Sequence, residues 1–425
     1  MLNRGLIIVV SILWGLGAYA QDSTSLDLTG VRVRAIKYNS QMQKAGLSLR
    51  ESQKMLWEAI SQGLPQVNAS VDYQNFLGAE MSFAGQTMKF KPSSSASAQV
   101  SQLLFSGNYL VGVQIAKLYE NLSQTQTKKT DLDVVEQVSN SYYAILVSEK
   151  SIGILRKNLD NVKDLYKRTE SLAKVGVVEE TEVLQLSIQV SNLENALKSA
   201  ARQLEMAYNI LRLQLGIKME SPLQVVGNID DVANSVNLDA LLAQKFDINS
   251  NLDFQLVEGQ SAVKEKQILL QKMSYLPTIS GFYTFNAKLI KPEFDMTPKN
   301  VVGLKANIPI FASGQRKAAV DRAKLQHESA LVDRNLLVDN LYIQSKQLKN
   351  NMQTYYEQYQ TQKKSVDISK LVYNKFASKF EQGMVSSIDL NTTNNNYLAA
   401  ESNLLSSMLN LLKAKSEFER LYGTK

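Results

Sequence analysis

The carboxylates are the side chains in this sequence whose grouping most suggests a candidate catalytic or binding site. Acidic residues gather near two distant glycines: Glu179, Glu180 and Glu182 near Gly176, and Glu381 and Asp389 near Gly383. A catalytic carboxylate pair would also need a pocket for its substrate, and the sequence indicates none. The dipole of a helix favours acids at its N-terminus, so solvated acids that begin two helices are one interpretation of this grouping.

Other reactive side chains are sparse. The chain has no cysteine, which excludes thiol catalysis and cysteine metal sites. Its one histidine, His327, has no second histidine with which to share a metal. The run from Tyr355 to Tyr359 fits helix packing better than stacking on a substrate, and no nucleophile-elbow motif is present. We therefore predict a protein that is not an enzyme and binds no cofactor and no metal.

Charge and hydropathy limit the partners and the location. The formal net charge of +7 comes from Lys and Arg that are scattered along the chain, so a nucleic-acid patch is not expected. Residues 1–20 have the pattern of a secretory signal peptide: Arg4, an apolar stretch, and Ala18-Tyr19-Ala20 before Gln21. Beyond residue 20 no apolar run reaches the length of a transmembrane helix, so a membrane location would have to use strands.

The acidic residues are positioned by two very long helical hairpins. From Asn108 to Ala173 the chain has no proline and carries a heptad seam. The seam residues are Leu155, Leu159, Val162, Tyr166, Thr169 and Ala173. After Gly176 the seam resumes at Leu186. At 1.5 Å per residue the first arm would be roughly 100 Å long, which is a rod rather than a compact domain.

Short alternating segments precede each hairpin. Residues 66–76 alternate between apolar and polar side chains after Leu64-Pro65, and a second strand from Ser95 ends at Ser106-Gly107. Thr278–Ala287 and Val301–Phe311 repeat this pair between Leu276-Pro277 and Ser313-Gly314. Such alternation fits hairpins of an outer-membrane barrel or ordinary soluble hairpins. In a barrel, one apolar set would face lipid: Val71, Tyr73, Ile279, Tyr283 and Phe285.

The chain is an internal duplication. The offsets 314 − 107, 383 − 176 and 423 − 216 are each 207, and all six positions are glycine. The predicted segments are the signal peptide (1–20), an N-terminal helix (21–63), a strand pair (64–107), a helical hairpin with its tip at 174–180 (108–215), a middle segment (216–245), a helix (246–274), a second strand pair (275–314), and a second helical hairpin with its tip at 381–387 (315–423).

Helix lengths predict how these segments stack. The helix at 181–215 and the helix at 246–274 together match the first long arm in length, so the simplest geometry places them end to end beside it. The same reasoning places the C-terminal helix end to end with the N-terminal one. The stacked helices would form a tall helical tube with the strands at one end and both glycine tips at the other. The segment 216–245 would bulge outward at mid-height of this tube.

This plan resembles the TolC-like outer-membrane efflux protein family over nearly all of the mature chain. The resemblance rests on the duplication, the Leu-Pro strand entries, the Ser-Gly strand exits, and the glycine tips. It implies an α+β membrane protein whose long coiled-coil hairpins form a periplasmic barrel. A 12-stranded β-barrel would continue that barrel, with four strands from each chain of a homotrimer. The implied location is the outer membrane of a Gram-negative bacterium, in contact with its lipid.

The resemblance also implies a function. The chain would be a passive conduit for small molecules or proteins in tripartite efflux or type I secretion. A periplasmic adaptor and an inner-membrane transporter of the RND or ABC class would be its partners. The alternative is a periplasmic coiled-coil adaptor or scaffold without a pore, which would not need lipid-facing strands.

The family relation assigns roles to a few positions. The tip turns at Gly176, Val177, Gly383 and Met384 would dock the adaptor, and Glu182 and Asp389 would form an acidic ring at the periplasmic entrance. Gly107 and Gly314 would relieve backbone strain at the strand-to-helix junctions. The Tyr and Arg that latch the tip in well-studied members are replaced by Phe380 and Val385 in the second half and by Ala173 and Val178 in the first, so the sequence does not predict how the tip is latched.

Overall fold

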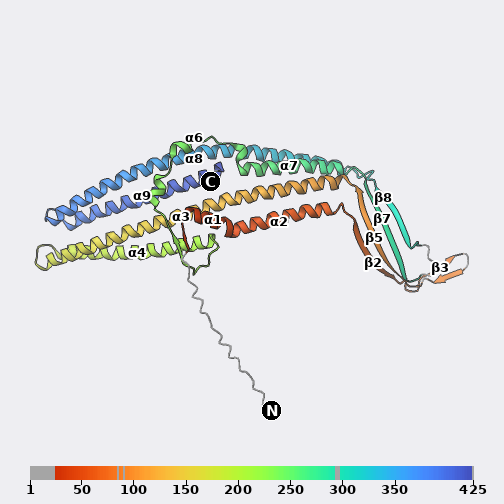
Figure 1. The fold of residues 1–425 in the computed structure, drawn as a ribbon, viewed down its shortest axis with the longest axis horizontal. Helices are drawn as coiled ribbons and strands as arrows, with labels where there is room; N and C mark the ends of the chain where they lie inside the picture. The colour runs from red at the N-terminus through yellow and green to blue at the C-terminus, as the bar shows by residue number, and fades with distance from the viewer. Residues whose placement is uncertain (1–23, 84–85, 90, 292–296, 424–425) are drawn as a thin grey trace, which may run out of the picture.

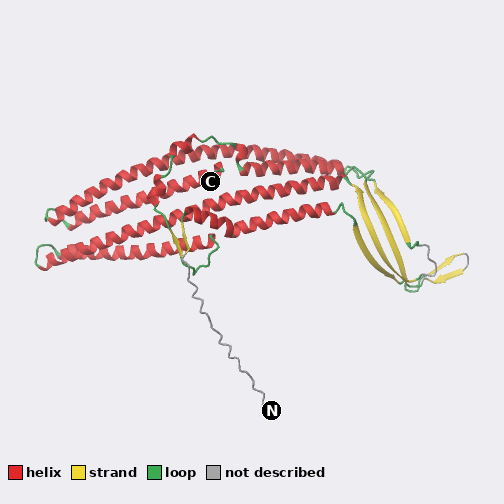
Figure 2. Ribbon diagram, viewed as in Figure 1, coloured by secondary structure: helices red, strands yellow, loops and turns green. Residues whose placement is uncertain are grey.

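The computed structural model describes residues 24–83, 86–89, 91–291 and 297–423, so the predicted signal peptide lies outside the described residues. The chain forms a long helical shaft with a curved sheet at one end (Figures 1 and 2). Both helical tips lie at the opposite end of the shaft. In the part of the chain that the structure describes, no helix is both long and apolar enough to cross a membrane.

Two long hairpins build the shaft. Helix α3 (Gly107–Lys174) has 68 residues and returns as α4 (Glu180–Gln214), and α8 (Gln315–Glu381) has 67 residues and returns as α9 (Ser387–Tyr422). The side chain of Ser106 caps α3 by accepting from the backbone N–H of Tyr109 at 3.3 Å. At 1.5 Å per residue each long helix spans roughly 100 Å.

Each long helix is flanked by two shorter helices that stack end to end, but the pairing differs from the one that lengths predict. Helix α4 stacks on α2 (Ser40–Ser61) beside α3, and α9 stacks on α7 (Leu252–Met273) beside α8. The expected pairs, the 181–215 helix with the 246–274 helix and the N-terminal helix with the C-terminal one, are wrong. Total length allows either pairing, whereas specific hydrogen bonds at the junctions select one.

Two buried asparagines make these junctions. Asn39 is the N-cap of α2 and donates from Nδ2 to the Gln214 carbonyl oxygen at 2.8 Å. Asn251 is the N-cap of α7 and donates to the Leu421 carbonyl oxygen at 3.0 Å. The asparagines are 212 positions apart, as are Pro65 and Pro277, while the two acceptors share the 207 offset of the glycines. The junction is therefore part of the duplicated unit.

The N-terminal segment is more divided than the pattern from Leu26 to Gly63 predicts. It contains β1 (Thr24–Leu26), α1 (Leu28–Tyr38) and then α2. The break at Asn39 lets α4 end against it. Gly216, at φ +62°, turns the chain away there, and an added Cβ would lie 2.7 Å from the Tyr38 carbonyl oxygen. The glycine therefore permits both the turn and the close approach.

The middle segment crosses the shaft at mid-height. Strand β6 (Leu223–Val225) pairs in parallel with β1, and α5 (Ile229–Asn234), α6 (Leu238–Ala243) and a 3-10 turn (Ile248–Ser250) lead to α7. Helix α5 contacts α3 and α9, and α6 contacts α8. The segment thereby ties the two hairpins together where the main core lies.

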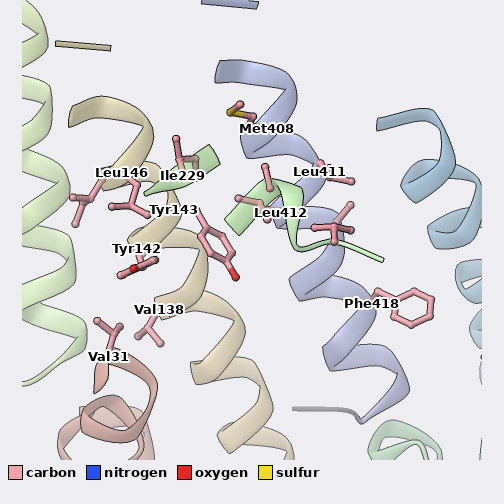
Figure 3. Packing of buried hydrophobic residues seen from close by; sticks show 14 of the residues in the cluster. Val31, Val138, Tyr142, Tyr143, Leu146, Ile229, Met408, Leu411, Leu412 and Phe418 are labelled. Atoms are coloured by element: carbon pink, nitrogen blue, oxygen red, sulfur yellow. The ribbon is translucent and has the colours of Figure 1, made fainter. Parts of the chain in front are cut away.

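The main apolar core surrounds this crossing. Side chains from α1, α3, α5 and α9 meet there (Figure 3): Val31, Val138, Tyr142, Tyr143, Leu146, Ile229, Met408, Leu411 and Leu412. At its edge the Tyr208 hydroxyl donates to Glu149 Oε1 at 2.6 Å and accepts from the Val225 N–H at 3.3 Å. Burial, together with that carboxylate, raises the pKa of Tyr208 to about 12.

The sheet contains four antiparallel strands in the order β2-β5-β7-β8. Their bounds are Gln66–Gln74, Ser93–Phe105, Thr278–Ile290 and Asn300–Asn307. A small hairpin, β3 (Glu80–Phe83) with β4 (Gln86–Lys89), lies in the loop between β2 and β5. The expected strand Val301–Phe311 ends early, at Asn307, because its partner residue Thr278 is the first of β7.

Candidate functional site

The two helical tips share one turn geometry. At the first tip the N–H of Gly176 donates to the Ala173 carbonyl and that of Val177 to the Leu172 carbonyl, at 2.9 and 3.0 Å. At the second, Gly383 and Met384 make the corresponding bonds, both at 2.9 Å. These paired bonds define the Schellman motif, which needs a left-handed residue at the glycine position. Gly176 has φ +76° and Gly383 φ +69°.

The tip glycines are needed for their conformation and not for space. A Cβ at Gly176 or at Gly383 would meet no atom within 4 Å. Around them the turns present apolar side chains to solvent: Val175 is 73 % exposed, Val177 66 % and Met384 65 %.

The two acids of the expected entrance ring have different surroundings. The Glu182 carboxylate reaches the other hairpin and accepts from the Ser387 hydroxyl at 2.6 Å. The exposed Asp389 carboxylate instead closes a capping box at the start of α9, accepting from the Ser386 hydroxyl at 2.8 Å and from its N–H at 3.4 Å. Asp389 therefore lies in the first turn of α9 and stabilises the start of this helix, in the position that the helix-dipole interpretation describes.

Two further polar contacts join the hairpins near the tips. Arg168 on α3 pairs with Glu381 on α8 at 3.3 Å, and both side chains are about two-thirds exposed. Gln189 on α4 donates to Asn395 Oδ1 on α9 at 3.0 Å. An exposed ion pair contributes at most about 1 kcal/mol, so the hairpins are held here by several weak contacts.

A groove of about 620 Å³ lies between α3, α8 and α9, and Arg168 and Glu381 are among its lining residues. Phe380, at the family's Tyr position, lines the groove together with Tyr373 and Leu390. Val385, at the Arg position, is half-buried in the turn. The resemblance assigns Phe380 and Val385 to the Tyr and Arg positions of the latch, and neither side chain can make the polar contacts of a Tyr–Arg pair.

The two strand-to-helix glycines have different physical roles. Gly314 is the left-handed N-cap of α8 at φ +80° and has open space around it. Gly107 is the first residue of α3, and an added Cβ would lie 2.9 Å from Met273 Cβ and 3.2 Å from Leu276 Cδ1. Backbone relief therefore describes Gly314, whereas Gly107 allows close packing.

The sheet has one apolar face and one polar face. Paired residues Val67, Val100, Tyr283 and Val302 form a row across all four strands on the first face. Val302 is 82 % exposed and Val67 71 %, so no described part of the chain covers these positions of the face. The opposite face carries a hydrogen bond between the hydroxyls of Ser70 and Ser97 at 2.9 Å. The expected set Val71, Tyr73, Ile279, Tyr283 and Phe285 lies in the alternating positions of the apolar face.

Sequence reasoning missed the cross-hairpin partners. Ser387, Arg168 and the Gln189–Asn395 pair belong to no motif, because they come together only through packing of separate helices. The Ser386-x-x-Asp389 capping box was missed as well, although its spacing is a sequence signal for the start of a helix. Among the described residues no group of three or more His, Cys, Asp or Glu could hold a metal ion.

Comparison with known proteins gives one family and one fold. The profile of the family described as "Outer membrane efflux protein" matches residues 31–217 and 248–424. A relative named "Probable efflux pump outer membrane protein TtgC", from Pseudomonas putida KT2440, is 20% identical over 71% of this chain. The match spans 62% of that relative's length. Another, SepC from Pseudomonas putida F1, is 22% identical over 74% of this chain and 66% of its own length.

Solved structures match over almost the whole chain. The Campylobacter jejuni CmeC outer membrane channel superposes with a TM-score of 0.77 and 16% identity, covering 93% of this chain and 85% of its own. The open state of the Neisseria gonorrhoeae MtrE outer membrane channel gives a TM-score of 0.74 and 17% identity, covering 93% and 89%. At this identity the likeness concerns the fold.

Proposed function

This chain belongs to the outer membrane efflux protein family, and we propose that it is the outer-membrane channel of a tripartite efflux or type I secretion system. The family is one of channel proteins in the Gram-negative outer membrane, with helices that extend into the periplasm. The chain would act as a passive conduit and not as an enzyme. Small molecules or proteins would cross the periplasm and the outer membrane inside it.

The two-faced sheet is the observation that carries this proposal. Its strands β2 and β8 have free edges within one chain, and free edges invite pairing with another copy. Three copies that pair edge to edge would give 12 strands, an even number in the range of outer-membrane barrels. The uncovered apolar face would contact lipid, and the Ser70–Ser97 face would line a water-filled lumen. A periplasmic adaptor or scaffold without a pore would have no use for these strands.

The tips are the proposed docking surface for a periplasmic adaptor, which would in turn bind an inner-membrane transporter. Support comes from the exposed Val177 and Met384 beside turns whose glycines fix the backbone. The tip end lies roughly 100 Å from the sheet, a length that suits a span across the periplasm.

The entrance is the proposed site of charge selection. A homotrimer would bring three copies each of Glu182 and Asp389 to the narrow end, and like charges in a confined mouth attract cations. The acidic positions one helical turn further along in the family are Gln185 and Thr392 here. The expected selectivity is therefore weaker than that of two acidic rings.

Planar-bilayer recording of the purified trimer tests the channel and its entrance together. We expect discrete conductance, a preference for cations, and partial block by divalent cations. The double variant Glu182→Gln with Asp389→Asn should lose much of the preference, and the variant Glu205→Gln, a change of the same chemistry far from the tips, should not. Absence of any conductance from a correctly assembled trimer would refute the channel. Unchanged selectivity in the double variant would refute the proposed role of Glu182 and Asp389 at the entrance.

A further inference from the structure

The apolar face of the sheet is hollowed at one place. The hollow has a volume of about 570 Å³ and lies between β5, β7 and β8. Its lining includes Val100, Leu104, Gly281, Tyr283, Val302 and Leu304. Glycine makes the hollow, since Gly281 stands in line with Leu304 across the strands and has no side chain to fill the row.

Apart from Gln102, the side chains that line the hollow are apolar, and no described part of the chain covers them. Leu304 is 76 % exposed, Val302 82 % and Leu104 56 %. A Cβ built on Gly281 would lie 3.6 Å from Leu104 Cδ1 and 3.6 Å from Leu304 Cδ2, so these two side chains stand on either side of the gap. The hollow is therefore a shallow, mostly apolar depression in this face, which suits contact with a hydrocarbon chain.

Basic side chains lie where the hollow's strands meet the helices. Lys272 lies in the last turn of α7, and Arg316 and Lys317 lie in the first turn of α8. Among the described residues none of the three has an acidic partner within 4.0 Å. The Arg316 guanidinium lies 5.9 Å from the ring centre of Tyr275, which is half exposed. This arrangement places unneutralised positive charge beside an aromatic side chain, as at a membrane–water interface.

The length of strand between the hollow and the helix end of the sheet fits one lipid chain. From Gly281 to Thr278, where β7 begins, the strand covers about 10 Å. Half of a bilayer core is about 15 Å thick, so a chain that starts at the helix end of the sheet would reach past Gly281. The helix end is the periplasmic end, and a lipid bound there belongs to the inner leaflet.

We propose that the hollow at Gly281 and the basic residues Arg316 and Lys317 form a binding site for one anionic phospholipid per chain. An acyl chain lies between Leu104 and Leu304, and the phosphate accepts hydrogen bonds from Arg316 and Lys317. The proposal rests on the proposed function, because it needs the apolar face in a bilayer. All of its residues come from one chain, so the site does not depend on how copies associate.

The test uses the mature trimer, titrated in detergent with phosphatidylglycerol and followed by native mass spectrometry. Wild type should retain one phosphatidylglycerol per chain. Gly281→Leu fills the hollow and should weaken retention about tenfold. Ala69→Leu adds the same side chain to the same face outside the hollow, and it should leave retention unchanged.

A second variant tests the head group without altering the sheet. Wild type should retain phosphatidylglycerol more strongly than phosphatidylcholine, because only phosphatidylglycerol has a net negative head group. The double variant Arg316→Gln with Lys317→Gln should weaken phosphatidylglycerol retention about tenfold and retain both lipids equally. Equal retention by wild type and Gly281→Leu, or by wild type and the double Gln variant, would overturn the proposal. A protein that conducts in bilayers but retains no phospholipid overturns this inference alone. A protein that fails to enter the outer membrane or to conduct overturns the proposed function.

Discussion

Replacing Asn251 by alanine should destabilise the fold more than the loss of an ordinary helix cap. The side chain is 4 % exposed and makes two buried hydrogen bonds, from the Phe254 N–H at 3.1 Å and to the Leu421 carbonyl at 3.0 Å. Loss of an N-cap costs about 1 kcal/mol. A buried carbonyl left without a donor costs about 1–3 kcal/mol more. We expect a total of about 2–4 kcal/mol.

Asn237 provides the matched control. It is the N-cap of α6 and accepts from the Ala240 N–H at 3.1 Å, but the bond is exposed and joins no second helix. Asn237→Ala should therefore cost only about 1 kcal/mol. The variant Asn251→Asp separates the two contributions, because it keeps the capping acceptor and loses the donor to Leu421.

Thermal unfolding of the detergent-solubilised protein, followed by far-UV circular dichroism, measures the difference. The unfolding midpoint of Asn251→Ala should lie clearly below that of Asn237→Ala. The midpoint of Asn251→Asp should also lie below that of Asn237→Ala, because this variant loses the donor to Leu421. Asn39→Ala should behave like Asn251→Ala, since the junction is duplicated. If Asn251→Ala and Asn237→Ala melt together, the end-to-end junction contributes no stability and its assignment here is wrong.

Three further results are expected. Val100→Lys near the middle of the apolar face should cost about 2–4 kcal/mol and reduce the yield of assembled trimer on unboiled gels. Gln99→Lys on the other face should be tolerated. Equal yields would mean that the strand register, and with it the assignment of the two faces, is wrong. Gly383→Val puts a β-branched residue at φ +69° and should abolish efflux while the trimer still reaches the membrane; full complementation would place docking elsewhere. Because the pKa of Tyr208 is raised in the folded state, its contribution to stability is complete below pH 10 and is lost as the pH rises toward 12, where the unfolded chain ionises first. In Tyr208→Phe the unfolding midpoint should therefore fall less steeply with pH over this range. The same fall in the variant and in wild type would contradict the burial of this hydroxyl.

Sequence periodicity alone predicts much of this architecture. Helical hairpins of this length need a continuous seam, and the seam is visible from Leu155 onward because it depends on spacing along one chain. Left-handed turns need glycine, so Gly176 and Gly383 mark both tips. Strands with two different environments need alternation, which Val67 to Tyr73 show. Each of these features depends on residues that are close in sequence.

Only the tertiary structure decides which separate segments meet. Helix lengths fit two stacking arrangements equally well, and the buried hydrogen bond from Asn251 to Leu421 selects one. The acids Glu182 and Asp389 occupy equivalent positions in the repeat, yet one reaches Ser387 on the other hairpin and the other caps its own helix. A side chain's partners across a helix interface depend on the relative rotation and offset of two helices. Those quantities come from packing of the whole shaft and leave no local pattern in the sequence.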